Sequence, residues 1–254
     1  MHPDQHNAVI CNNCHQSFTG KYCSHCGQKA TAGKLSLHEV WHDLVHAFVH
    51  ADKGILRLSI DIMIRPGKVY HGYFSGKRKT YFSPVMFFLL LAGIYVILGE
   101  KLWDWEDHIT GRHDEFGRIL HRLEKERFLI FMPVISLITW GLFYKRYNFA
   151  ESFTFWFFCS GATFIAGMLG YIPQFIWVHH RDVIRYWADW IVFGMILWHV
   201  FVVFYKKDWW SGIRCVLLAV ICYFLLVYAF ALLAYREGVP LELNPWLILK
   251  SIFT

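Results

Sequence analysis

The stretch that decides the fold class is residues 82–99, FSPVMFFLLLAGIYVILG, which contains no charged side chain. A helix needs about 20 mainly apolar residues to cross a bilayer, with a range of about 17 to 25. This stretch meets that requirement, and four later stretches of the chain also meet it. We therefore predict five transmembrane helices, at residues 82–99, 128–144, 152–178, 187–205 and 213–235.

The overall composition agrees with a membrane protein. Hydrophobic residues make up 56% of the 254 positions and aromatic residues 19%, whereas charged residues make up only 17%. A soluble domain has about a quarter charged residues, and it could not hold so many aromatic side chains without large exposed apolar patches. The same figures exclude a disordered chain and a small disulfide-rich secreted protein.

Lys and Arg are distributed unevenly among the segments that join the predicted spans. They gather before the first span, after the second, and between the fourth and fifth, whereas residues 100–127 hold eight acids and six bases. Cytoplasmic segments of membrane proteins are enriched in Lys and Arg. We therefore expect a multi-pass membrane protein with a cytoplasmic N-terminus.

Two CxxC motifs near the N-terminus predict a metal site. The four cysteines are Cys11, Cys14, Cys23 and Cys26. This is the ligand type and spacing of a zinc ribbon, and four thiolates leave no open coordination position, so the predicted zinc is structural. A segment of about 30 residues is too short to form a stabilising core, so the segment should fold only with metal. His15 and His25 are alternative ligands, but with four thiolates present we interpret them as exposed loop residues.

Residues 35–64 have the apolar period of a helix, and on another side of that helix histidine recurs at every fourth position. These histidines are His38, His42, His46 and His50. Neighbours four residues apart could share a metal ion, and a pH-responsive face is a further interpretation. Because positions four apart drift around a helix of 3.6 residues per turn, the four side chains cannot all meet one ion. A plain polar helix face is the simpler interpretation.

The next segment, residues 65–84, reads RPGKVYHGYFSGKRKTYFSP. Its cations alternate with tyrosines just before the first span, and its prolines and glycines indicate a shaped loop. Cations at this level suit anionic lipid phosphates or another phosphate-bearing ligand. The alternative is that they only set the topology and anchor the interface. The candidate ligand residues are Arg65, Lys68, Lys77, Arg78, Lys79 and Tyr81.

The order of these motifs resembles a known family. A CxxC…YCxxCGQK ribbon, a helix, and then RPG…Y..GKRK.Y..P before the first span look like a family of bacterial multi-span membrane proteins. Its members are common in Bacteroidota, occur also in proteobacteria, and share a domain of unknown function. The resemblance covers about residues 8–100. It implies a multi-pass protein of the bacterial inner membrane with a cytoplasmic ribbon on a membrane bundle, and it supplies no catalytic residue.

Within the predicted spans, His199 is the clearest ionisable candidate. Ionisable groups inside a membrane are functional candidates, but a lone histidine most often hydrogen-bonds a neighbouring helix. No other predicted span has a central acid or base, which argues against a proton-coupled pump. The motifs GxSxG and HExxH, the P-loop and the dinucleotide fingerprint do not occur.

Together these features predict an all-α integral membrane helical bundle with about five transmembrane helices and a small N-terminal zinc ribbon. The predicted parts are the ribbon at 1–34, an amphipathic helix and basic pre-membrane loop at 35–81, the bundle at 82–236, and an interfacial tail at 237–254.

The favoured function is a non-enzymatic channel, transporter or lipid-interacting scaffold on anionic lipids, whose ribbon contacts a partner protein or a second copy. Nucleic acid is not an expected partner, because few cations lie near the ribbon. The alternative is a membrane enzyme that acts on a lipid or phosphate-bearing substrate. It would use His71, Lys77, Arg78 and tyrosines of the loop.

Overall fold

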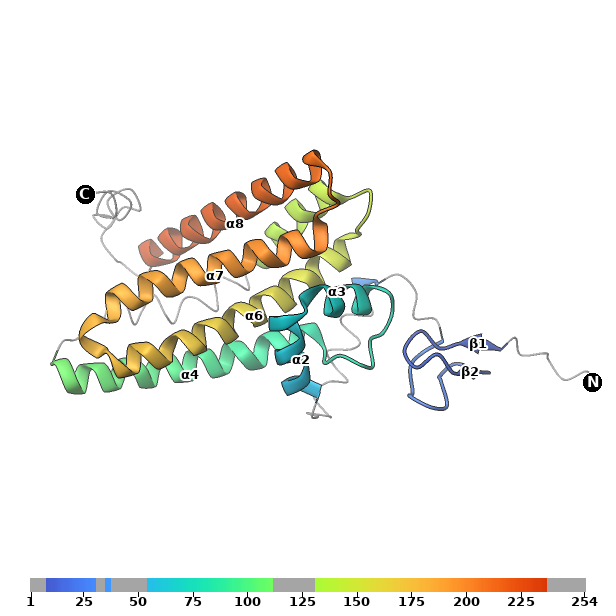
Figure 1. Ribbon diagram of the computed structural model, residues 1–254, viewed down its shortest axis with the longest axis horizontal. Coiled ribbons are helices and arrows are strands. Elements are labelled where there is room, and N and C mark those ends of the chain that lie inside the picture. Colours follow the sequence, from blue (N-terminus) through green and yellow to red (C-terminus); the bar gives the residue numbers. More distant parts are fainter. Residues whose placement is uncertain (1–7, 31–34, 38–53, 112–130, 237–254) are drawn as a thin grey trace, which may run out of the picture.

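The computed structural model describes residues 8–30, 35–37, 54–111 and 131–236. In these ranges a bundle of long helices carries a small two-stranded head, residues 8–30, near one end (Figure 1). The antiparallel strands of the head are β1 (Val9–Ile10) and β2 (Ser17–Phe18). The helices are α2 (Gly54–Ile64), α3 (Pro66–Phe74), α4 (Pro84–Thr110), a helix at Phe131–Phe143, α6 (Phe149–Ile176), the 3-10 helix η1 (Val178–His180), α7 (Arg181–Phe204) and α8 (Trp209–Arg236).

Three described helices are long and apolar enough to cross a membrane, and they correspond to the first, third and fourth predicted spans. They are Pro84–Thr110, Phe149–Ile176 and Val183–Phe204. The second and fifth predicted spans fall on shorter apolar helices of the described part, Phe131–Phe143 and Trp209–Cys222. The first of these directly follows residues 112–130, which lie outside the described ranges, and α8 continues to Arg236. By length and composition, the described residues thus support three spans, where the sequence predicted five.

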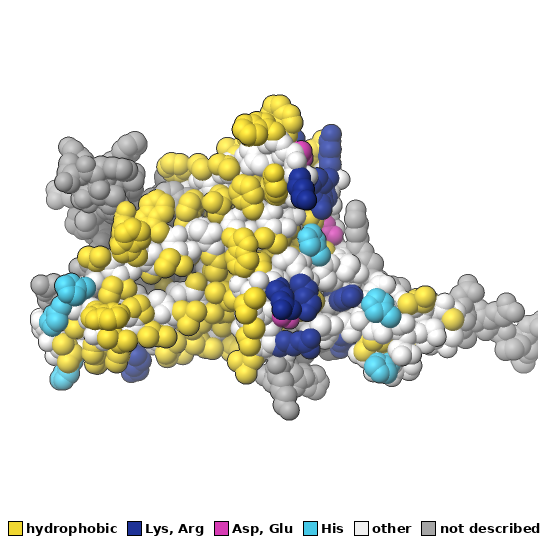
Figure 2. All heavy atoms as spheres, in the orientation of Figure 1, with side chains coloured by type: hydrophobic (Ala, Val, Ile, Leu, Met, Phe, Trp, Pro, Cys, Tyr) yellow, Lys and Arg dark blue, Asp and Glu magenta, His cyan; other side chains and the backbone are white. Residues whose placement is uncertain are grey.

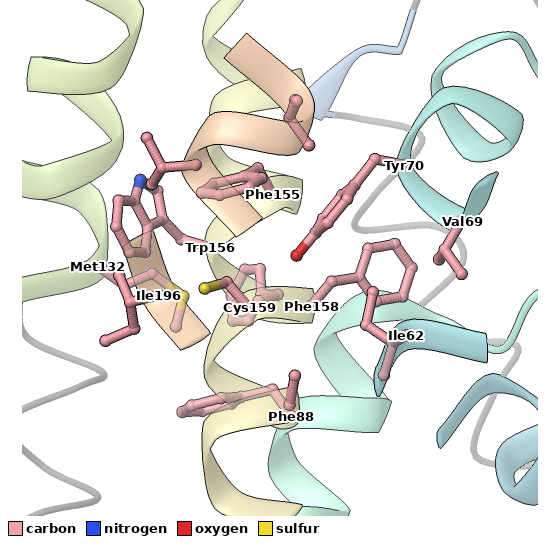
Figure 3. Close-up of a cluster of buried hydrophobic side chains, with 14 of the residues drawn as sticks. Ile62, Val69, Tyr70, Phe88, Met132, Phe155, Trp156, Phe158, Cys159 and Ile196 are labelled. Atoms are coloured by element: carbon pink, nitrogen blue, oxygen red, sulfur yellow. The ribbon is translucent and has the colours of Figure 1, made fainter. Parts of the chain in front are cut away.

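Aromatic rings fill the space between α4, α6 and the neighbouring elements (Figure 3). The rings of Phe87 and Phe88 on α4 meet those of Phe158 and Phe157 on α6, with centroids 6.1 and 5.5 Å apart. Both pairs are edge-to-face, an arrangement that aromatic quadrupoles favour. Some of the many aromatic residues in the sequence therefore pack in the core of the bundle.

Two glycines of α6 face α4 at positions that have no room for a side chain. A Cβ atom on Gly161 would lie 2.4 Å from the ring of Phe87, and one on Gly167 would lie 2.6 Å from the ring of Tyr95. Small residues allow membrane helices to approach closely. These two glycines therefore set the distance between α4 and α6.

Several polar side chains inside the bundle form hydrogen bonds within it. On the helix Phe131–Phe143, the hydroxyl groups of Ser136 and Thr139 donate to carbonyl groups one turn earlier. The indole N–H of Trp156 on α6 donates to the hydroxyl oxygen of Thr139 at 2.8 Å. Since hydrocarbon offers no hydrogen-bond partner, such bonds make polar residues compatible with a membrane interior.

The segment predicted as a basic pre-membrane loop contains a helix, α3. Pro66 occupies its first turn, where a missing backbone N–H costs nothing, and it separates α3 from α2 as the sequence indicated. Val69, Tyr70 and Tyr73 are at most 1% exposed, because positions three and four apart share the face turned to the bundle. The neighbouring Gly67, Lys68 and Gly72 concealed the helical period in the sequence. The loop is confined to residues 75–83, which we call the basic loop.

Candidate functional site

The four predicted metal ligands come together in the head. The Sγ atoms of Cys11 and Cys26 lie 3.6 Å apart, as do those of Cys14 and Cys23, and all four sulfurs are within 4.8 Å of one another. Sulfurs bound to a tetrahedral zinc at about 2.3 Å would lie about 3.8 Å apart. The cluster therefore fits a four-thiolate metal site.

The two CxxC turns have the same backbone construction. The N–H of Cys11 donates to the carbonyl oxygen of Gln16 at 2.9 Å, and the N–H of Cys23 donates to that of Gln28 at 2.8 Å. Gly27 follows the second turn with a φ of 70°, a left-handed conformation that favours glycine. Each turn thus presents its two sulfurs to the same point.

The electrostatics of the cluster favour a bound cation. Burial opposes ionisation of Cys11, but the backbone N–H groups of Cys14 and Asn13 outweigh it and lower the pKa of this thiol to about 7. At Cys14 a hydrogen bond from the backbone of Gln16 favours ionisation, yet burial and the neighbouring sulfurs raise the pKa to about 12. Ionisation of one thiol therefore disfavours ionisation of the next. A divalent cation among the sulfurs would compensate the repulsion between the thiolates.

His15 and His25 are exposed and do not belong to the sulfur cluster. Among the described residues, these four cysteines form the only group of three or more His, Cys, Asp or Glu side chains whose ligand atoms lie close enough to share a metal ion. The histidines His38, His42, His46 and His50 lie outside the described residues, so the hypothesis of a second metal site there stays a prediction.

The head rests on the basic loop through side chains of its two CxxC turns. The amide of Gln28 donates to the carbonyl oxygen of Gly76, and its oxygen accepts from the backbone N–H of Lys79 at 3.4 Å. The hydroxyl of Thr80 donates to Asn13 at 2.6 Å. Gln28 is only 3% exposed. The structure thus joins two motifs that the sequence presented separately, the cysteine pairs and the GKRK segment.

Lys and Arg side chains gather at the end of the bundle nearest the head, which we call the head end (Figure 2). Besides the predicted ligand residues, this end carries cations from the turns after Phe143 and Phe204. The cations of the head end are Arg65, Lys68, Lys77, Arg78, Lys79, Lys145, Arg146, Lys206, Lys207 and Arg214. Of the predicted residues, Lys77 and Arg78 are half-buried, whereas Arg65, Lys68 and Lys79 are exposed.

The acids described at the head end are engaged by their own chain. The Asp61 carboxylate lies 3.9 Å from Arg57, Glu151 accepts from the N–H of Asn148 in the capping box of α6, and Asp208 accepts from the N–H of Ser211. That last hydrogen bond holds the pKa of Asp208 below its usual value. Asp208 also interacts electrostatically with Lys206 and Arg214. Because these three carboxylates are fewer than the ten cations listed above, the described part of the head end keeps a positive surplus.

Two other residues of the basic segment have defined roles in the structure. The hydroxyl of Tyr81 donates to the carbonyl oxygen of Lys68 at 3.3 Å, and a Cβ atom on Gly72 would lie 2.9 Å from that hydroxyl oxygen. Tyr81 therefore folds back over α3. Burial lowers the pKa of His71, and the nearby Arg146 lowers it further, so both disfavour the protonated form of this side chain.

The predicted intramembrane histidine is bonded to a residue that the sequence did not connect with it. His199 on α7 is 0% exposed, and its Nδ1 atom lies 2.9 Å from the hydroxyl oxygen of Tyr70 on α3. Tyr70 enters the core between Phe155 and Phe158 of α6 (Figure 3), with ring centroids 4.9 and 6.1 Å away. The expectation of a structural hydrogen bond to a neighbouring helix agrees with this geometry. The partner, however, comes from a segment that precedes the first span.

We expect Tyr70→Phe to destabilise the protein by about 1 to 3 kcal/mol, because it removes the hydroxyl and leaves a buried histidine nitrogen without its partner. The measurement is the free energy of unfolding in detergent. Tyr144→Phe is the matched control, since Tyr144 is 60% exposed. Equal stability of the two variants would contradict a structural role for the Tyr70–His199 bond.

A groove of about 570 Å³ runs between α7 and α8. Tyr205, Asp208 and Trp209 line its head end, and Leu217 and Val220 line its far part. From Asp208 to Val220 the helix rises about 18 Å, comparable with the about 15 Å depth of one leaflet's hydrocarbon. A smaller cavity lies inside the bundle beside Cys159 and Cys222. His199 lines neither of them.

One comparison with known proteins gives a match. The model of a family described as a protein of unknown function (DUF3667) matches residues 52–96, which include α2, α3, the basic loop and the first part of α4. The chain is therefore similar to an uncharacterised family over this short stretch. No curated protein and no solved structure matches the chain.

Proposed function

We propose that this protein is a non-enzymatic scaffold of the bacterial inner membrane that binds anionic phospholipids at its head end, with structural zinc in the head. The observation that carries the proposal is the positive surplus at this end, contributed by several helix termini and the basic loop (Figure 2). Anionic leaflets attract such cations by about 1 kcal/mol per Lys or Arg.

The apolar surface of α2 supports contact with a lipid interface. Leu58 and Ile62 are buried against the bundle, whereas Leu56, Ile60 and Ile64 on another side are 60 to 72% exposed. The exposed residues are four positions apart and so form one stripe. A helix with this stripe beside a cationic surface suits the boundary between headgroups and acyl chains.

The groove between α7 and α8 supports the choice of a phospholipid as ligand. Its walls are apolar and its head end adjoins Lys206 and Lys207, which precede Asp208 and Trp209. An acyl chain would lie along the apolar walls while its phosphate meets the lysines. Since Lys and Arg favour the cytoplasmic side, the proposal places the head in the cytoplasm, where its thiols stay reduced.

The interior of the bundle gives less support to transport or catalysis. His199 is enclosed by packed rings and bonded to Tyr70. The one ligand-type cluster of the described residues is a closed set of four thiolates, which offers no open coordination position. His71, which the alternative hypothesis of a membrane enzyme would use, lies beside a cation, Arg146.

The test is the thermal stability of the purified protein in detergent with added phosphatidylglycerol or phosphatidylcholine. We expect phosphatidylglycerol to raise the Tm more, and high salt to reduce the difference because it screens exposed charges. Neutralising Lys77, Arg78 and Lys79 together, or Lys206 and Lys207 together, should remove about 1 kcal/mol of this stabilisation per cation. Lys101→Gln, on α4 outside the head end, is the control. Equal responses to the two lipids would contradict the proposal.

A further inference from the structure

The head touches the bundle through the same short segments that hold its cysteines. Asn13 lies between Cys11 and Cys14, and Gln28 is two residues after Cys26. The conformation of these turns depends on the sulfur cluster, because a head of this size has little apolar core; its buried hydrophobic residues are Cys11, Phe18 and Cys23. The positions of Asn13 and Gln28 therefore depend on a metal that fits the four sulfurs.

The side chain of Gln28 forms two hydrogen bonds with the backbone of the basic loop. Its amide group donates to Gly76 and its amide oxygen accepts from Lys79, on either side of Lys77 and Arg78. Gly76 has a φ of 98°, a left-handed conformation that favours glycine. The counterpart in the first CxxC turn, Gln16, is exposed. Only one of the two equivalent glutamines thus holds the loop.

We propose that the metal-loaded head is a latch on the basic loop: Gln28, positioned by the sulfur cluster, holds residues 76–79 with Lys77 and Arg78 half-buried, and loss of the metal releases them. The latch itself rests on the hydrogen bonds of Gln28 and Asn13. Its consequence rests on the proposed function, since a released loop presents more positive charge to anionic lipid.

Trypsin provides a direct test, because the loop contains three consecutive cleavage sites, Lys77, Arg78 and Lys79. In the full-length protein in detergent, Gln28→Ala should keep its metal and increase cleavage in this loop about 30-fold, as expected when one buried and one partly buried hydrogen bond of about 1 kcal/mol each are lost. Removing the metal with a chelator should have the same effect, and added zinc should reverse it.

Two controls separate release of the loop from general unfolding. Gln16→Ala changes the equivalent residue of the other turn and should leave cleavage in the loop unchanged. Cleavage after Lys145 and Arg146, in the exposed turn before α6, should stay constant in all samples. Unchanged cleavage of the loop in both Gln28→Ala and the metal-free protein would overturn the latch.

The lipid assay then distinguishes the latch from the proposed function. We expect Gln28→Ala to respond more strongly to phosphatidylglycerol than Gln16→Ala does. Because the protease assay needs no lipid, a released loop with an unchanged lipid response would contradict the role of the loop in lipid binding. The latch would stand in that case.

Discussion

Replacing Cys23 by serine is expected to abolish metal binding and to unfold the head. Cys23 is 3% exposed, and its sulfur lies 3.6 Å from that of Cys14, so its loss leaves three thiolates and a hydroxyl at the cluster. Structural zinc sites in small domains contribute about 10 to 16 kcal/mol of apparent binding free energy. The residual core of the head cannot replace that contribution. The measurement is metal content per purified chain by elemental analysis.

Cys159→Ser is the matched control for this variant. Cys159 is also buried, but it lies on α6 beside the small interior cavity, outside the sulfur cluster. This variant should keep its metal, and so should a double His15→Ala, His25→Ala variant, because the cluster consists of sulfur alone. Full metal content in Cys23→Ser would overturn the metal site, and loss of metal in the histidine variant would contradict the all-cysteine ligand set.

Gly161→Ala is expected to destabilise the bundle strongly, although it adds only one methyl group. The new Cβ atom would lie 2.4 Å from the Phe87 ring, a distance that carbon atoms cannot adopt. Phe87 is 0% exposed and packs on Phe158, so its ring cannot move without shifting other rings. Overpacking of this kind costs about 1 to 3 kcal/mol, and α4 must move away from α6. Thermal unfolding in detergent measures the loss.

Gly194→Ala provides the comparison, since a Cβ atom on Gly194 of α7 meets nothing within 4 Å. Alanine also has the higher helix propensity, so this variant should be as stable as the original protein or slightly more stable. If both alanine variants had the same Tm, the close approach of α4 and α6 would be wrong.

The sequence predicted the parts of the molecule that depend on local pattern. The spacing of Cys11, Cys14, Cys23 and Cys26 was sufficient for the sulfur cluster, because two residues between cysteines already fix a tight turn. Long apolar runs likewise predicted α4, α6 and α7, because the thickness of the bilayer sets the length of a spanning helix. These features need no knowledge of how distant segments pack.

The contacts between distant segments could not be predicted. Nothing local to Tyr70 indicates that it reaches His199, since the two are 129 positions apart. Gln28 was also missed as the contact to the basic loop, although its presence in a CGQK motif was visible. A polar residue next to a metal-binding CxxC turn is ordinarily exposed to solvent. Gln28 is buried because the basic loop lies against it.

The entry of α3 into the bundle has a consequence for how the chain is made. Tyr70 is synthesised before α4, yet its partner His199 emerges 129 residues later. At about 5 to 20 residues per second, that interval is about 6 to 26 s. During this time the apolar face of α3 has no α7 against which to pack. Insertion of α4 and α6 into a membrane as they emerge would therefore precede completion of the core, and α3 would take its final place only after α7 has been made.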